Sequence, residues 1–67
     1  MQVYIFTTEE HGILGVYESH TKAVNAMHKF MINNNDELIN ASKSYSLNVN
    51  YYYGKKDTAT ISTQDVY

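Results

Sequence analysis

The chain has 67 residues, enough for a single small domain over residues 1–67 with a modest hydrophobic core. It contains no cysteine, which excludes disulfides and argues against a structural zinc site built on thiolates. The formal net charge is −2, which excludes a general electrostatic attraction to nucleic acid. Among the usual supports of a small domain, self-association is the one that this composition favours.

The N-terminus lacks the features of a secretory signal. Met1 to Thr7 contains no Lys or Arg, and polar residues follow at positions 8–10. No stretch of the sequence reaches the roughly 20 apolar residues of a membrane span. We therefore expect a soluble, cytoplasmic protein without membrane contact.

The first 17 residues predict a β-hairpin. Gln2 to Thr7 is rich in β-branched and aromatic side chains, which is typical of a strand. A polar loop follows, and Ile13 to Tyr17 forms the returning strand. Its Gly15 indicates either a bulge or the close approach of a large side chain.

Residues 20–33 predict an amphipathic helix. Ser19 precedes this segment and has the hydroxyl group of a good N-cap. Ile32 lies outside the apolar stripe, and the Asn residues at 33–35 end the helix because Asn tolerates left-handed dihedrals. At about 100° per residue, the stripe that faces the sheet consists of Ala23, Val24, Ala26, Met27, Phe30 and Met31.

Two segments near the C-terminus predict a second hairpin. Between residues 44 and 53 apolar and polar side chains alternate with a period of two, the clearest strand pattern in the chain. This interpretation puts Tyr51 and Tyr53 in or near the core and Tyr52 on the opposite face. A turn leads to a β-branched strand at 58–63, after which the chain frays.

Two hairpins around one helix predict an α+β fold of order ββαββ. We expect a four-stranded, mainly antiparallel sheet with the helix packed on one face. The segment 36–43 stays open between one helical turn and an anchored loop. Because one helix covers one face, either Val3 with Ile5 or Tyr4 with Phe6 is left uncovered, and such a patch is typical of dimerisation or binding.

The chain opens with Val3-Tyr4-Ile5-Phe6 and continues, after a polar loop, with Gly15-Val16-Tyr17-x-Ser19-x-x-Lys22-Ala23-x-x-Ala26. This opening resembles that of many short, uncharacterised proteins of phages and bacteria. The similarity covers residues 3–31, a hairpin followed by a Ser-capped helix, and it brings no catalytic residues. It implies a small phage accessory protein that modulates a host or defence protein.

The sequence shows no constellation that supports catalysis or metal binding. His20 and His28 are eight residues apart and about 80° apart around the helix, so they are not a ligating i, i+4 pair, and His11 lies on a loop elsewhere. The carboxylate pairs at 9–10 and 36–37 are expected to be solvated. No nucleophile elbow or phosphate-binding glycine loop occurs. We expect no enzyme activity, no cofactor and no metal.

The candidate interaction residues are aromatic side chains and two turn lysines. Tyr occurs seven times, and its ring with a polar tip suits a contact surface. The cluster at 51–56 has rings that could stack on nucleic acid bases and lysines that could neutralise phosphate, but an ordinary strand and turn is preferred. The candidates are Tyr4, Phe6, Tyr17, Tyr52, Lys55 and Lys56.

These observations favour a non-enzymatic protein that acts by protein–protein binding, forms a homodimer and docks on an unidentified host or defence protein. One alternative is a dimeric protein that binds or sequesters a nucleotide, with Tyr rings stacked on the base and Lys contacting phosphate. Another is a weak nucleic-acid-binding module that uses Tyr52, Lys55 and Lys56.

Overall fold

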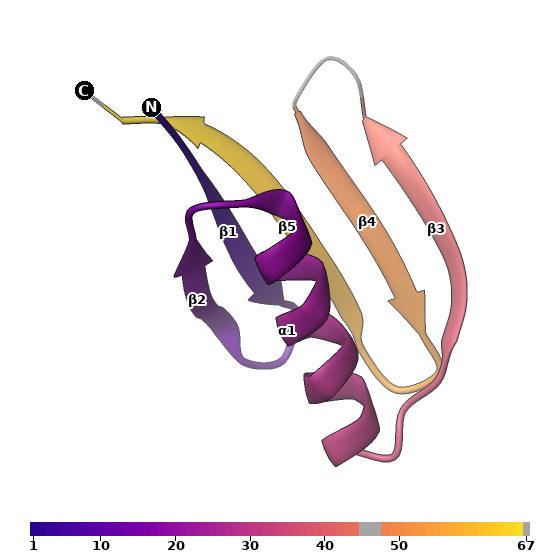
Figure 1. Ribbon diagram of the computed structural model, residues 1–67. Coiled ribbons are helices and arrows are strands. Elements are labelled where there is room, and N and C mark those ends of the chain that lie inside the picture. The colour runs from indigo at the N-terminus through magenta and orange to yellow at the C-terminus, as the bar shows by residue number, and fades with distance from the viewer. Residues whose placement is uncertain (45–47, 67) are drawn as a thin grey trace.

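The computed structural model describes residues 1–44 and 48–66. It shows an antiparallel five-stranded sheet of order β2-β1-β5-β4-β3, with one helix on one face (Figure 1). The elements in chain order are β1 (Gln2–Thr8), β2 (Gly12–Tyr17), α1 (His20–Asn33), β3 (Leu38–Ser44), β4 (Val49–Gly54) and β5 (Thr58–Asp65).

The first hairpin and the helix have the predicted positions. β1 and β2 pair antiparallel, and α1 runs from His20 to Asn33 as the pattern indicated. The Ser19 hydroxyl caps the helix by accepting a hydrogen bond from the Lys22 backbone N–H at 3.2 Å. After the helix, Asn35 has a φ of 53°, the left-handed conformation that Asn adopts more readily than most residues. Both ends of α1 are therefore determined by local sequence.

The sheet has five strands where the sequence predicted four. The additional strand is β3, which takes up residues 38–43 of the segment 36–43, so this segment is neither a helical turn nor a loop over most of its length. Its residues, Leu-Ile-Asn-Ala-Ser-Lys-Ser, include several with low β propensity. As an edge strand it takes its ladder hydrogen bonds from β4. Pairing with a neighbour has outweighed the propensity of the segment itself.

The long strand predicted over residues 44–53 is interrupted. β3 ends at Ser44 and β4 begins at Val49, and these two residues are partners in the β3–β4 hairpin. Asn48 precedes Val49 with a φ of 51°, so an Asn in the left-handed region again accompanies a reversal of the chain. The part of the predicted strand at residues 45–47 lies outside the described residues.

β1 and β5 form the centre of the sheet. They pair along their whole length, from Gln2 with Asp65 to Thr8 with Ala59. β5 therefore continues past the predicted end of that strand at residue 63, because β1 offers partners for the extra residues. Residue 67, which was expected to fray, lies outside the described residues.

The core lies between the helix and the central strands. The predicted stripe of α1 faces the sheet, and its Met27 is completely buried together with Ile61 of β5. Phe30 packs its ring edge to face against Phe6 of β1, with the ring centroids 5.8 Å apart. The buried apolar residues are Phe6, Ala23, Met27, Met31, Ala59 and Ile61.

Replacement of Met27 tests this core. Met27→Ala should lower the free energy of unfolding by about 2–5 kcal/mol, because it removes buried groups and leaves a cavity. Lys29→Ala, on the exposed side of the same helix, is the control and should change little. Urea unfolding followed by circular dichroism measures both. Equal midpoints for the two variants would contradict the assignment of the helix face.

Candidate functional site

One face of the sheet is left without a covering layer by the described elements. In a strand, neighbouring side chains point to opposite faces, and cross-strand partners share a face. Phe6 and its partner Ile61 face the helix. Ile5 and its partners Val16 and Ser62 therefore face away from it. Figure 1 shows α1 on one side of the sheet and no element on the other.

This open face carries no charge at any of its described strand positions. Its apolar members include Val16 and Ile13 of β2, which are 58% and 68% exposed. The rings of Tyr51 and Tyr53 stack nearly parallel, with centroids 6.3 Å apart. The open face consists of Val3, Ile5, Thr7, Ile13, Val16, Asn40, Ser42, Val49, Tyr51, Tyr53, Thr58, Thr60, Ser62 and Gln64.

The helix covers the Tyr4 and Phe6 side of β1, which settles the alternative that the sequence left open. Phe6 is 2% exposed and belongs to the core, so a partner cannot reach it. Tyr4 is half-buried and contacts the ring of His20 edge to face at 5.7 Å. The uncovered pair is Val3 with Ile5.

Tyr52 points to the helix side, opposite to the face that the sequence indicated. It pairs with Ala59, which is buried beneath the helix, and burial raises the pKa of the Tyr52 hydroxyl. Tyr51 and Tyr53 are on the open face instead of in or near the core. The alternation correctly placed Tyr52 on one face and Tyr51 with Tyr53 on the other, but a period of two does not say which face meets the helix.

The side chain of Tyr17, the last residue of β2, lies on the helix side of the sheet. It is half-buried, and a Cβ atom at Gly15 would come within 2.6 Å of its hydroxyl oxygen. Both possibilities raised for Gly15 are therefore present, because the β1–β2 register also shifts directly after the Phe6–Gly15 pair. Substitution of this glycine would displace the Tyr17 ring.

The two turn lysines have partners in the segment after the helix. Lys55 Nζ lies 3.3 Å from a carboxylate oxygen of Glu37. Lys56 Nζ donates a hydrogen bond to the backbone carbonyl of Asn34 at 3.1 Å. Both ammonium groups therefore already interact with groups of the chain, which weakens the hypothesis that they bind nucleic acid phosphates.

A groove lies on the helix side of the sheet, beside the N-terminal end of α1. The helix packs mainly over β1, β2 and β5, so β3 and β4 remain open on this side. The groove has a volume of about 510 Å³, and within it the amide nitrogen of Asn50 lies 3.0 Å from Nε2 of His20. Its lining residues are Gln2, Tyr4, His20, Lys43, Asn48, Asn50, Tyr52 and Thr63.

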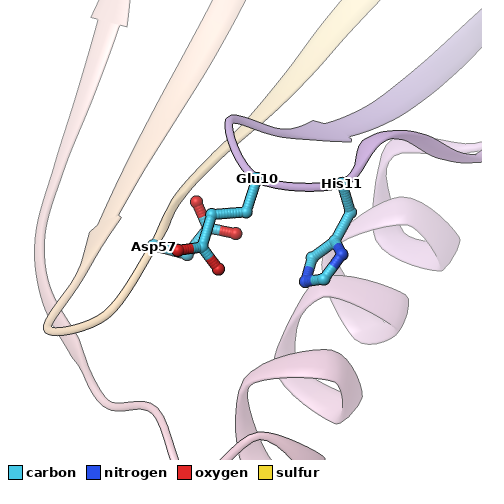
Figure 2. A group of neighbouring side chains, drawn as sticks. All are labelled: Glu10, His11 and Asp57. Atoms are coloured by element: carbon cyan, nitrogen blue, oxygen red, sulfur yellow. The ribbon is translucent and has the colours of Figure 1, made fainter.

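Three potential metal ligands meet at one end of the sheet. The β1–β2 loop supplies Glu10 and His11, and the turn before β5 supplies Asp57. One donor atom from each lies within 4.8 Å of the other two. Figure 2 shows the two carboxylates side by side, with the imidazole ring facing them. The sequence indicated only that His11 lies on a loop away from His20 and His28, because its contact with Asp57 depends on the pairing of β1 with β5.

Two members of this cluster, His11 and Asp57, are held by specific contacts. The backbone N–H of His11 donates to the Thr8 hydroxyl at 3.0 Å, and its ring meets the ring of Phe30 edge to face at 5.5 Å. Oδ1 of Asp57 accepts a hydrogen bond from the Thr58 N–H at 2.8 Å. Oδ2 of Asp57 is buried and has no hydrogen-bond partner among the described residues.

Asp36 fixes the turn that carries Asp57. Its carboxylate accepts hydrogen bonds from the backbone N–H groups of Lys56 at 3.0 Å and Asp57 at 3.2 Å. Gly54 leaves room for it, since a Cβ there would lie 2.6 Å from the carboxylate. Desolvation opposes ionisation of Asp36, but the backbone N–H groups of residues 56, 37, 57 and 55 outweigh it and lower its pKa.

Comparison of the chain with protein-family models, with curated proteins and with solved structures finds no match. Within the described residues, no helix has the length and apolar character that a membrane crossing requires. The surfaces and contacts described above are therefore the basis for a functional proposal.

Asp36→Asn should lower the melting temperature near neutral pH, because it removes the charge that the turn N–H groups stabilise. The folded-state pKa lies below the ordinary value of 3.8, so this contribution is present above that value. It is lost as the pH falls through the folded-state pKa. The difference in melting temperature between wild type and variant should therefore be largest at about pH 6 and decrease in acid.

Melting curves from about pH 6 down to about pH 2 measure this difference, a range that spans the ordinary titration of Asp. Asp65→Asn, an exposed acid on β5, is the matched control. A difference for Asp36→Asn that stays constant over the whole range would contradict the role of its charge.

Proposed function

We propose that this protein acts in the cytoplasm as a non-enzymatic interaction protein and forms a homodimer through the open face. The observation that carries the proposal is an uncovered sheet surface, mostly of Val, Ile, Thr and Tyr, without a charged side chain at its described positions. Burial of such a surface releases water from apolar groups and does not require desolvation of ions. Tyr is enriched in protein interfaces for the same reason.

The first partner that we propose is a second copy of the chain. In a two-fold contact each surface meets its own equivalent, so an uncharged face avoids like-charge repulsion. Five strands about 4.8 Å apart, rising about 3.3 Å per residue, give a face of roughly 500 Å². Two copies would bury roughly 1,000 Å², about the smallest area that a specific interface needs.

The second proposed partner is a host or defence protein, as the resemblance of residues 3–31 to phage and bacterial proteins implies. A dimer through the open faces leaves the helix side of each copy accessible. The outer surface of α1 carries Lys22, Asn25 and Lys29, which are exposed. This polar surface would then be the one that meets the other protein.

The groove favours a second candidate function, the binding of a small ligand such as a nucleotide. Tyr4 and Tyr52 border it with aromatic rings, and Lys43 adds a positive charge. The remaining lining residues are mostly amides and hydroxyls, which suit hydrogen bonding to a polar ligand. The arrangement fits a base stacked on Tyr with phosphate near Lys.

Light scattering with size-exclusion chromatography tests the dimer. At micromolar concentration the wild type should have twice the chain mass of 7.7 kDa. Val16→Lys introduces a charge on the open face and should shift the protein toward the monomer. Ile32→Lys makes the same kind of change on the helix, where Ile32 is 73% exposed, and should remain dimeric. A monomeric wild type, or equal dissociation of both variants with native circular dichroism, would contradict the proposal.

Thermal-shift measurements test the groove. A nucleotide that binds there should raise the melting temperature in a saturable manner, since binding to the folded state alone stabilises it. Lys43→Ala should reduce this response, whereas Lys29→Ala, outside the groove, should retain it. The absence of a response to any ribonucleotide would remove the second candidate function.

A further inference from the structure

We propose that Glu10, His11 and Asp57 form a binding site for a divalent transition-metal ion such as Zn²⁺. The site joins the β1–β2 loop to the turn between β4 and β5. It lies away from the open face and does not depend on the function proposed for that face.

The donor set selects the class of ion. One imidazole nitrogen and two carboxylate oxygens are ligands that Zn²⁺ and its first-row neighbours accept. Mg²⁺ and Ca²⁺ prefer oxygen ligands alone and gain little from imidazole. Three protein ligands leave the fourth position of a tetrahedral ion to water.

The distances allow the three donors to meet on one ion. With metal–ligand bonds of about 2.0–2.1 Å, the donors of a tetrahedral site lie roughly 3.3 Å apart. Here the donor atoms are already within 4.8 Å of one another. Glu10 and His11 are exposed, so small side-chain rotations can close the remaining distance, while Asp57 is held by its hydrogen bond to Thr58.

The environment of Asp57 Oδ2 is a second observation in favour of a cation at this site. This oxygen is buried and has no hydrogen-bond partner among the described residues. A buried carboxylate oxygen without a partner costs free energy, and the second oxygen of the same group is already used by Thr58. A cation between Asp57 and Glu10 supplies the interaction that this oxygen lacks.

The charges around the cluster favour a cation. Three carboxylates and one ammonium group line the adjoining pocket, which has a volume of about 230 Å³. The ammonium group of Lys56 is bonded to the Asn34 carbonyl. Within residues 1–44 and 48–66, neither Glu10 nor Asp57 takes part in an ion pair. The two neighbouring carboxylates therefore repel each other until a cation binds.

A bound ion would act as a cross-link in a chain that has no cysteine to form a disulfide. It would link two segments that are far apart in sequence at the end of the central strand pair. Binding to the folded state alone would raise the stability of the whole domain with ion concentration.

Isothermal titration and thermal melts of the untagged wild-type protein with ZnCl₂ test the site. We expect saturable binding of one ion per chain, a higher melting temperature, and a much weaker response to Mg²⁺. Glu10→Gln and His11→Ala alter exposed residues and should weaken Zn²⁺ binding at least about tenfold.

Glu9→Gln and His28→Ala are matched controls, since they remove the same groups at exposed positions outside the cluster. Both should bind Zn²⁺ like the wild type. The proposal is overturned if Zn²⁺ binding does not saturate, if Mg²⁺ has the same effect, or if a control weakens binding as much as its counterpart in the cluster. Circular dichroism of each variant shows whether a change in Zn²⁺ binding is caused by loss of the fold.

Discussion

The width of one helix limits how much of this sheet can be covered. A helix of 14 residues is about 21 Å long and 10 Å wide, whereas neighbouring strands are about 4.8 Å apart. α1 can therefore shield two or three strands, and it packs mainly over β1, β2 and β5. The core forms beneath it, where Met27 meets Ile61. The groove over β3 and β4 and the uncovered opposite face both follow from this mismatch in size.

Local features of the fold were predictable from the sequence, because their causes lie within a few residues. The Ser19 cap and the apolar stripe determine α1 without reference to the sheet. β3 was missed because an edge strand takes its structure from its neighbour. The faces of Tyr51 and Tyr52 were exchanged because the pairing of β4 with β5, not the alternation, decides which one meets the helix.

The two proposed sites differ in how far the sequence could reveal them. An uncovered apolar pair on β1 was expected, since two-faced apolar strands and a single helix are visible in the pattern. The cluster of Glu10, His11 and Asp57 was not, because its members come from the two ends of the chain. Only the pairing of β1 with β5 brings their loops together, and a single sequence carries no sign of that pairing.

The central position of the last strand also bears on how the chain folds during synthesis. The first hairpin and α1 emerge from the ribosome together, but the core beneath the helix also contains Ala59 and Ile61 of β5. Until β5 is made, the N-terminal half has no partner for the long edge of β1. Contacts this distant in sequence slow the search for the native state. We therefore expect the domain to fold only after β5 is made, with the apolar face of the helix exposed in the nascent chain until then.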